Sequence, residues 1–450
     1  MRKRGIALVL LLSLVVGICG CGAAEIAPAD REESPYKISE ELVIGGEEPG
    51  EEEPGDKPEE ENPGLSEEEE ATLASITNLP AGVNGFAFRM YGQLNGDDDF
   101  FFSPYSLCAA LSMLNLGADE ETKTEIEAVL GIEDFDAWNA EMQKYLERQW
   151  TGDTYVITAN AIWLDENKDF ADTMEKGFLE PAAEYYQSEL HKGDFSGNIT
   201  AVIGEINSWA DKNTRSMIPE IINRLPESTV MVLLNAVYFE GKWDNAFKEE
   251  KTCKDTFYGT NGESQIDMMN QYWEEYAYVE YEGIKGVSLP YKGEEVAMKI
   301  FIPIEDDGDI TELFGALSDT EKQHLLDKLD TCGKEELTRL TIPKFTIEKA
   351  IEDLPGILRD MGMESAFDPN NANFDVIAAD LYVSQVLHKA KIEVDEEGTK
   401  AAAVTVIVGN DATAIMEPEY YEFIADRPFI YVLQDTKTGM ILFMGRVNNL

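Results

Sequence analysis

The chain has 450 residues, enough for one large domain or for two or three domains of ordinary size. It is 44% hydrophobic and 10% aromatic, which is enough to build a sizeable core. Its 88 acidic and 36 basic residues give a formal net charge of −52, which argues against a nucleic-acid partner, because such partners are bound by clustered lysine and arginine.

Residues 1–20 have the pattern of an export signal. Three basic residues are followed by an apolar run, residues 6–18, that is too short to span a membrane stably. The ICGC motif at residues 18–21 resembles a bacterial lipobox, which predicts a signal peptide cut before Cys21 and acylation of that cysteine. Because Cys19 fits the lipobox poorly, an ordinary signal peptide cut nearby stays the alternative. Both versions predict an exported protein, either a cell-surface lipoprotein or an extracellular one.

Residues 21–75 are expected to be the acylated Cys21 followed by a disordered acidic tether. The stretch GGEEPGEEEPGDKPEEENPG is rich in glutamate, proline and glycine. Such a segment cannot bury enough apolar surface to offset its chain entropy, and its like charges extend it. About fifty flexible residues have an r.m.s. span on the order of 40 Å. An acidic interaction tail is the alternative for this segment.

Residues 76–450 are predicted to form one α+β domain, with helices mostly early and strands mostly late. Apolar spacing predicts helices over residues 83–94, 104–116, 122–130, 135–149 and 198–215. Strands are predicted over residues 155–164, 230–239, 295–302 and 338–345, with a final hairpin that turns at DTKTG. The run VMVLLNAVYF has one asparagine in an otherwise apolar stretch, which is typical of a strand buried on both faces.

Motifs for catalysis are absent from the sequence, which contains only three histidines. We find no HExxH, Walker loop, G-x-S-x-G elbow or G-x-G-x-x-G turn. The acidic residues 305–309 lack the ligand spacing and the closing glutamate of a calcium loop. Spacing alone does not exclude a catalytic triad built on His388. We nevertheless expect a protein that is not an enzyme and that uses no metal and no cofactor.

Three cysteines lie in the predicted domain, without CxxC or metal-ligand spacing. Cys108 falls in an apolar helical run and is interpreted as core packing. A disulfide between Cys253 and Cys332 is an open alternative to two separate thiols.

The most informative segment is EEGTKAAAVTVIV at residues 396–408. Gly398 interrupts the chain, small residues follow, and a β-branched run comes next. Read with period two, the face that begins at Thr399 is small and uncharged, so it can enter a packed sheet without overpacking it. An ordinary strand, in place from the start, is the alternative. The irregular stretch 410–421 before the next clear strand at Pro428 favours a segment that joins a sheet later.

These segments resemble the serpin family over about residues 76–450. In the family's order, the matching stretches are FFSPYSLCAALSMLNLGADEETKTEI, ITANAIWLDE, LLNAVYFEGKWDNAF, LTIPKFTI, VSQVLHKAKIEVDEEGTKAAAVT and DRPFIYVLQDTKTGMILFMGRV. So many motifs in order are a very specific signal. The resemblance implies helices packed around a large central sheet, two smaller sheets and an exposed reactive-centre loop at about residues 396–424.

By position, the resemblance implies three groups of site residues. The hinge comprises Glu396, Glu397, Gly398, Thr399, Ala401, Ala402 and Ala403. The shutter cluster comprises Ser103, Ser106, Asn235 and His388. The breach comprises Trp243, Lys344 and Glu396. Because an unpaired buried asparagine costs on the order of 1–3 kcal/mol, Asn235 is expected to bond to His388 or to a serine hydroxyl.

The activity that the resemblance implies is inhibition of serine-type endopeptidases by a suicide-substrate mechanism. A protease attacks the loop, forms an acyl-enzyme and is held when the freed hinge inserts into the central sheet as a new strand. Counting fourteen residues on from Gly398 places the cut at Ala412–Thr413, and counting back from the following strand gives Met416–Glu417. A small residue before the cut suits elastase-like or subtilisin-like proteases.

The expected partner is thus a serine protease in a covalent acyl complex, with a cysteine protease as a second option. A monomer is expected, with membrane contact only through the N-terminal lipid. A non-inhibitory serpin is one alternative, although such members carry bulky or charged residues where Ala401, Ala402 and Ala403 stand. Lys400 departs from the acidic residue often found at its position. A surface lipoprotein that binds a small ligand or glycan is the other alternative, and it predicts a pocket lined with aromatic residues.

Overall fold

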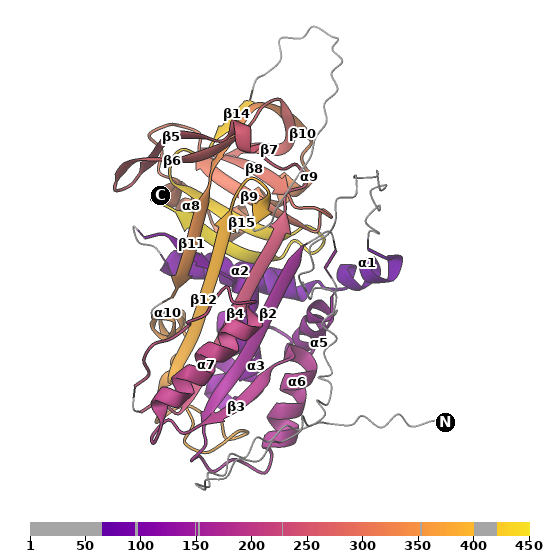
Figure 1. Cartoon of the computed structure of the whole chain (residues 1–450). Helices are drawn as coiled ribbons and strands as arrows, with labels where there is room; N and C mark the ends of the chain where they lie inside the picture. Colours follow the sequence, from indigo (N-terminus) through magenta and orange to yellow (C-terminus); the bar gives the residue numbers. More distant parts are fainter. Residues whose placement is uncertain are drawn as a thin grey trace, which may run out of the picture. The chain divides into compact units, whose positions relative to one another are not determined.

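Two β-sheets and the helices packed on them make up the fold (Figure 1). The computed structural model describes residues 65–94, 98–148, 150–151, 154–226, 228–351, 353–399 and 421–450. The helices are α1 (Glu67–Ala74), α2 (Asn78–Gln93), α3 (Pro104–Asn115), α4 (Glu120–Leu130), α5 (Phe135–Leu146), α6 (Glu180–Tyr186), α7 (Ile199–Asn213), α8 (Ile310–Ala316), α9 (Asp319–Thr331) and α10 (Leu354–Asp360). Three shorter helical turns are η1 (Glu175–Leu179), η2 (Glu249–Lys251) and η3 (Ser365–Phe367). The strands are β1 (Phe100–Phe102), β2 (Tyr155–Asp165), β3 (Glu189–Gly193), β4 (Met231–Lys242), β5 (Cys253–Gly259), β6 (Gly262–Gln271), β7 (Glu274–Tyr281), β8 (Ile284–Pro290), β9 (Val296–Pro303), β10 (Lys334–Pro343), β11 (Phe345–Ala350), β12 (Gln385–Val394), β13 (Gly398–Thr399), β14 (Tyr421–Ile424), β15 (Phe429–Asp435) and β16 (Ile441–Val447).

The two sheets differ in strand order and in size. The six-stranded sheet runs β11-β12-β4-β2-β3, with β13 paired to β4. The ten-stranded sheet runs β1-β16-β15-β9-β8-β7-β10-β6-β5, with β14 paired to β10. Strand β10 pairs with β7 through its first half and with β6 through its second half. The two smaller sheets expected from the sequence are therefore joined into one hydrogen-bonded network, and the central sheet has fewer strands than this network.

The α+β class and the order of the predicted elements are confirmed. Each predicted helix and strand is found within a few residues of its expected position. The predicted strand 338–345 is wrong at its end, because β10 stops at Pro343 and β11 begins at Phe345 in the other sheet. The apolar positions change phase at this point, from Leu340 and Ile342 to Phe345 and Ile347, so the sequence carries a sign of the break that the predicted single strand overlooked.

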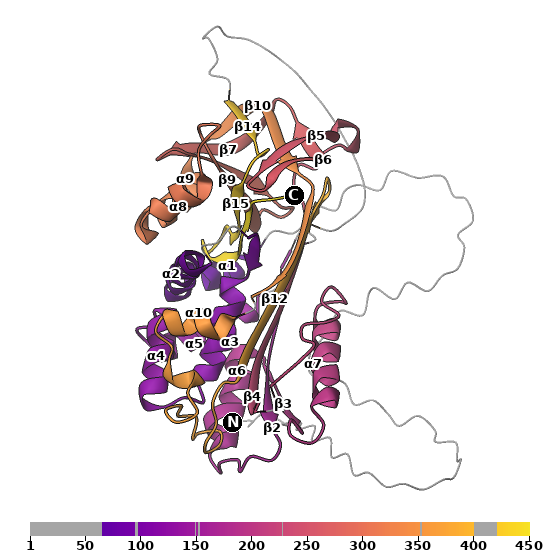
Figure 2. The ribbon, with the colours of Figure 1, turned by 90° about the vertical axis from the view of Figure 1, so that its left-hand side faces the viewer.

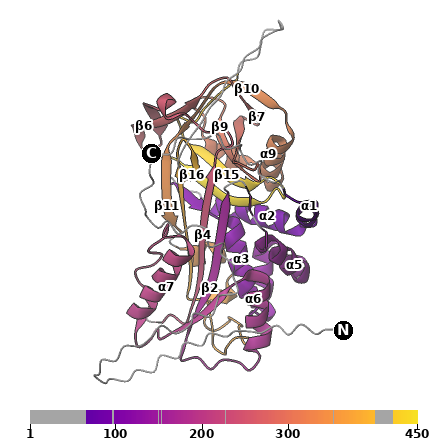
Figure 3. The same cartoon turned by 45° about the vertical axis from the view of Figure 1, so that its right-hand side comes forward.

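Strand β4 lies in the middle of the six-stranded sheet and is buried on both faces, as its apolar run predicts. Met231, Leu233, Val237 and Phe239 pack into the main core, which also contains residues of α3. The alternate residues pack into a second cluster with apolar side chains of α7. Helix α7 accordingly lies on the opposite side of this sheet from α3, α5 and α6 (Figures 2 and 3).

The predicted boundary of the acidic tether at residue 75 is wrong, because α1 lies inside the segment that was predicted to be disordered. Ser66 and Glu69 form a capping box at its start, and Leu73 is buried in the main core. The capping box and the apolar Leu73 are local helix signals, but the acidic composition around them favours disorder and led to the wrong prediction. Residues 1–64, with Cys21, lie outside the described part of the chain. In the described part, no helix has the length and apolar character needed to cross a membrane.

The three described cysteines are free thiols. Cys108 is fully buried on α3, in agreement with its interpretation as core packing. The disulfide between Cys253 and Cys332 is not formed, and geometry explains why. Cys332 lies two residues before the first residue of β10, whereas Cys253 pairs with Met268 of β6, which pairs with the end of β10. Ten strand residues span roughly 30 Å, far beyond the roughly 7 Å limit between the Cα atoms of a disulfide.

Candidate strand-insertion site

The shutter cluster lies where α3 meets the middle of the six-stranded sheet. Ser103 and Ser106 belong to the first turn of α3, where the Ser103 hydroxyl accepts a hydrogen bond from the Ser106 backbone N–H at 3.1 Å. Asn235 comes from β4 and His388 from β12, and these two residues are register partners. All four side chains are buried. The structure therefore brings together the four residues that the sequence assigned to this cluster.

Hydrogen bonds in the cluster define the protonation state of His388. The Ser103 backbone N–H donates to Nε2 at 3.1 Å, so Nε2 carries no proton. Nδ1 lies 2.7 Å from the Asn235 Oδ1 and donates to it. Burial lowers the pKa of His388 from 6.5 to about 3. The neutral ring is thus satisfied on both sides, and the expected hydrogen-bond partner of Asn235 is found.

Asn160 extends this cluster and was missed by the sequence analysis. It lies opposite Asn235 on β2, and the Asn235 Nδ2 donates to its Oδ1 at 2.8 Å. The same amide also donates to the Ser106 carbonyl at 3.0 Å. A lone asparagine inside the apolar segment 155–164 was the available signal, because it repeats the feature that identified Asn235. The polar network therefore links three strands to α3.

Strands β4 and β12 are paired through only part of their length. Their parallel register runs from Val232 with Gln385 to Ala236 with Lys389. Among the described residues, no pairing between these two strands continues beyond that point, although β4 extends to Lys242. The shutter pair of Asn235 and His388 lies near the end of the paired part. Strands β4 and β12 are therefore paired up to Ala236 and Lys389 and parted from there toward Lys242, the end of β4.

The hinge begins inside this parted region. Gly398 and Thr399 form β13, which pairs antiparallel with Lys242 and Gly241 at the end of β4. Thr399 is 2% exposed, and its hydroxyl lies 2.9 Å from the hydroxyl of Tyr291. Gly398 has φ +149°, and an added Cβ would lie 2.2 Å from the Gly241 carbonyl oxygen, so only glycine fits. Tyr291 follows an ordinary strand end, and nothing in the sequence distinguished it.

The breach residues hold the turn that leads into β13. The Trp243 indole N–H donates to the Asp395 carbonyl at 3.0 Å, and its ring stacks on Tyr291 with centroids 4.5 Å apart. The Trp243 backbone N–H donates to the Glu397 carbonyl at 2.8 Å. These contacts fix the backbone just before Gly398 and Thr399 of β13.

Glu396 is anchored by two donors from other segments. The Lys344 Nζ donates to one carboxylate oxygen at 2.6 Å, and the Thr252 hydroxyl donates to the other at 2.7 Å. Burial acts to raise the pKa of Glu396, but these hydrogen bonds outweigh it and the pKa is lowered. The Lys344 side chain is 38% exposed, so the ion pair is worth about 0–1 kcal/mol. Thr252 was not predicted, because a single half-buried threonine between η2 and β5 has no distinguishing pattern in the sequence.

The remaining site residues predicted from the sequence lie outside the described residues. These are Ala401, Ala402 and Ala403 of the hinge and both candidate cuts, Ala412–Thr413 and Met416–Glu417. The described chain resumes at Tyr421, the first residue of β14. Its carbonyl accepts a hydrogen bond from the Thr338 hydroxyl at 3.1 Å, which fixes the start of β14 on β10.

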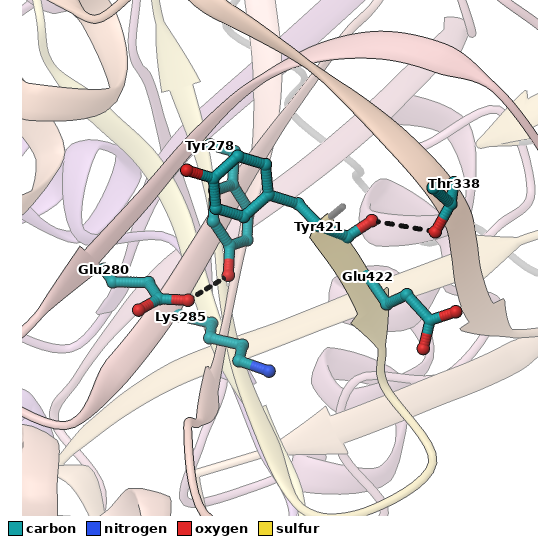
Figure 4. Close-up of a pocket in the computed structure, with 6 residues that line it drawn as sticks. All are labelled: Tyr278, Glu280, Lys285, Thr338, Tyr421 and Glu422. Atoms are coloured by element: carbon teal, nitrogen blue, oxygen red, sulfur yellow. Dashed lines mark hydrogen bonds between the residues drawn. The ribbon is translucent and has the colours of Figure 1, made fainter. Parts of the chain in front are cut away.

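A surface cavity of about 290 Å³ lies beside the start of β14 (Figure 4). It is lined by Tyr278, Glu280, Lys285, Thr338, Tyr421 and Glu422. The rings of Tyr278 and Tyr421 are 5.0 Å apart, and the Tyr278 hydroxyl donates to Glu280 at 2.6 Å. A second cavity of about 350 Å³ includes Leu65 and Thr151 in its lining. The first cavity lies just below, and the second at the lower end of, the roughly 300–1,000 Å³ of typical ligand pockets, and neither has an aromatic cage.

Comparisons with known proteins identify the family. The serpin family of serine protease inhibitors matches residues 81–450. A serpin-like protein of Thermococcus kodakarensis is 33% identical over 383 residues, which cover 82% of this chain and 84% of that protein. Antithrombin-III of Homo sapiens is 30% identical over 399 residues, covering 84% and 83% of the two chains. The native structure of the thermophilic serpin tengpin has a TM-score of 0.71 at 30% identity and covers 82% and 94%.

A structure of human thyroxine-binding globulin is similar to the same extent, with a TM-score of 0.72 at 27% identity and coverage of 83% and 99%. Both the sequence and the fold of this chain therefore match serpins over more than four fifths of its length. The protein is not an enzyme, and it belongs to the serpin family.

Proposed function

We propose that the protein inhibits serine-type endopeptidases as a suicide substrate. A protease cuts the reactive loop, and the freed segment that begins at Gly398 inserts between β4 and β12. The observation that carries this proposal is the parted sheet, in which β13 already pairs with the upper end of β4 while the β4–β12 ladder stops at Ala236 and Lys389. The inserting strand thus has its first two residues and its direction in place.

Insertion supplies the energy for trapping. About ten new backbone hydrogen bonds at a net value of about 1 kcal/mol each contribute on the order of 10 kcal/mol. Burial of the small hinge face adds to this value. The opposing terms are the β4–β12 pairing and the hydrogen bonds of the shutter cluster, which must separate before the strand passes. The native form is therefore kinetically stable: the height of the barrier to insertion sets its lifetime, and its equilibrium free energy does not.

The acyl-enzyme explains how a protein without catalytic groups stops an enzyme. The loop's acyl carbon stays bonded to the protease's serine oxygen until water hydrolyses the ester. If insertion is faster than hydrolysis, the protease is carried along with the strand and its active site is distorted. Small residues at the front of the hinge favour fast insertion, since overpacking a sheet costs roughly 1–3 kcal/mol. Thr399 meets this condition, because it already occupies a buried position in the sheet.

The loop is expected to be cut at Ala412–Thr413 by pancreatic elastase or subtilisin. A denaturing gel of the mixture should show a complex that survives SDS, because the two chains share an ester bond. Mass spectrometry should find a released peptide that starts at Thr413. A peptide that starts at Glu417 would move the cut to Met416–Glu417. Complete cleavage without a stable complex, by both proteases, would contradict inhibition of this protease class.

The lipid anchor is a separate part of the proposal, supported by the lipobox-like sequence at residues 18–21. When expressed in a bacterium with its full N-terminus, the protein should partition into the detergent phase of a Triton X-114 extraction. The Cys21→Ser variant should move to the aqueous phase, since it has no thiol to acylate. Equal partitioning of the two proteins would favour an ordinary signal peptide and an extracellular protein.

A further inference from the structure

Two large aromatic side chains are exposed at the two-residue bend between β6 and β7. Tyr272 is 41% exposed and Trp273 is 59% exposed. Strand β6 ends at Gln271, opposite Leu340 of β10, and β7 begins at Glu274, opposite Leu337, so β6 and β7 run in the same direction along one edge of β10 and the two aromatic residues bend the chain between them. Below, these two residues are called the aromatic turn. Aromatic side chains of this size are normally placed in a core or at an interface.

The backbone of the aromatic turn is strained as well. Trp273 has φ +62°, in the left-handed region where a bulky residue is a genuine outlier. The other described non-glycine residues with positive φ are glutamate, glutamine, arginine, serine and aspartate, so Trp273 is the aromatic exception among them. Glycine is the residue that adopts this conformation without strain. A tryptophan at this position therefore needs an explanation other than the shape of the turn.

The aromatic turn lies close to the point where the chain returns from the reactive loop. The Trp273 backbone N–H donates to the Leu337 carbonyl of β10 at 2.9 Å. On the other edge of β10, Leu337 is the register partner of Tyr421, the first residue of β14. Two strand spacings, roughly 10 Å, therefore separate the turn from the start of β14. Strands β6, β7, β10 and β14 gather at the same end of the domain (Figures 1 and 2).

The aromatic turn is also tied to the hinge side of the loop. The Gln271 side chain donates to the carbonyls of Asn245 and Ala246 at 2.9 and 3.2 Å. On the other flank, Asn245 donates to Glu274 at 3.1 Å. The next residue of that segment, Phe247, donates its backbone N–H to the Glu396 carbonyl at 2.8 Å. The turn thus lies beside the segments that hold both ends of the loop.

We propose that the aromatic turn is an exosite, which contacts the surface of the protease that is attacking the reactive loop. This inference rests on the proposed function. A protease bound to the loop must lie over the end of the domain where both loop ends are held, and Trp and Tyr are the residues that most often dominate such contacts. The Lys251 ammonium group lies 5.5 Å from the centre of the Tyr272 ring. Because Glu274 and Glu275 follow the aromatic turn directly, its surrounding charge is mixed, and the two rings fit an apolar patch on the protease surface beside the substrate-binding cleft.

The test compares Trp273→Gly and Tyr272→Ser with the parent protein. Glycine removes the ring and accepts the positive φ, so the fold is expected to be unharmed or stabilised. Tyr258→Ser is the matched control, because Tyr258 is 51% exposed near the other end of β6, paired with Glu263. The first readout is the second-order rate constant for inhibition of subtilisin and of pancreatic elastase. The second is the affinity for each protease with its catalytic serine replaced by alanine, which reports docking without cleavage.

We expect both aromatic-turn variants to lower the inhibition rate constant and the docking affinity by about tenfold or more for at least one protease. The control should match the parent, and the stoichiometry of inhibition should be unchanged because the hinge is intact. Parent-like docking by both variants, with both proteases, would overturn the exosite. If the parent is cleaved without trapping while the variants still dock more weakly, the exosite stands and the proposed inhibition fails. A parent that neither docks nor traps would overturn both.

Discussion

Replacing Thr399 with arginine is expected to turn the inhibitor into a substrate. Thr399 is 2% exposed at the head of the inserting strand, with its hydroxyl 2.9 Å from that of Tyr291. A guanidinium group stays charged, and burying it without a partner costs several kcal/mol. At 1.4 kcal/mol per factor of ten, a cost of about 3 kcal/mol slows insertion roughly 100-fold relative to ester hydrolysis. Titration of protease activity should give a much larger stoichiometry of inhibition, and gels should show cleaved chain in place of the complex.

Thr399→Ser is the control for this experiment, because serine keeps the hydroxyl and the small volume. It should trap protease nearly as well as the parent. The rate of loop cleavage should not fall in Thr399→Arg, since the scissile bond is distant in sequence and unchanged. If the arginine variant forms complex with the parent's stoichiometry, the strand does not insert through the parted region of β4 and β12.

Much of the fold could be predicted from the sequence, because its strongest elements are marked by residues that are neighbours in the chain. The apolar run of β4 and the Ser-Pro start of α3 each identify an element from local residues alone. The change of sheets at Lys344 was overlooked because its sign is slight, a shift of one residue in the apolar alternation between Ile342 and Phe345. The helix α1 was missed for the opposite reason, since four glutamates in its first turn give it the composition of the tether.

The site shows the same division between local and distant information. A polar residue in an apolar strand is a local signal, and it identified Asn235 and was available for Asn160. Tyr291 and Thr252 reach the hinge from segments about 100 and 140 residues away along the chain, through bonds of 2.9 and 2.7 Å. Only the assembled sheet brings them to Thr399 and Glu396. Their function is therefore a property of packing, which no single-residue pattern records.

In the proposed mechanism, hinge and shutter act from opposite ends on the insertion of the strand. Tyr291 and the breach residues favour the first two inserted residues, whereas the shutter cluster closes the path below them. Loss of the upper contacts should slow insertion after cleavage. Loss of the lower contacts should let the sheet open without cleavage, which shortens the life of the native form. The proposed inhibitor needs both sets of contacts. The upper contacts speed insertion after cleavage, and the lower contacts prevent the sheet from opening before a protease arrives.

Acidic pH is expected to weaken the lower contacts through His388. Its pKa is about 3 in the native protein and 6.5 when unperturbed, so the open or unfolded state binds the proton more tightly. The contribution of the neutral ring is complete above pH 6.5 and is lost progressively as the pH falls toward 3. At pH 5 the loss is about 2 kcal/mol, from 1.5 pKa units at 1.36 kcal/mol each. Urea unfolding at pH 7.5 and pH 5.0 measures it, or the unfolding rate where unfolding is irreversible.

The 88 acidic residues also titrate over this range, so the informative quantity is a difference between variants. His388→Gln keeps a donor and an acceptor but has no proton to bind, and it should lose about 2 kcal/mol less than the parent between the two pH values. His324→Gln, on the exposed face of α9, should follow the parent. Should His388→Gln show the parent's full loss, carboxylates would account for the pH dependence. The shutter would then separate without protonation of its histidine, by thermal opening of the β4–β12 pairing alone.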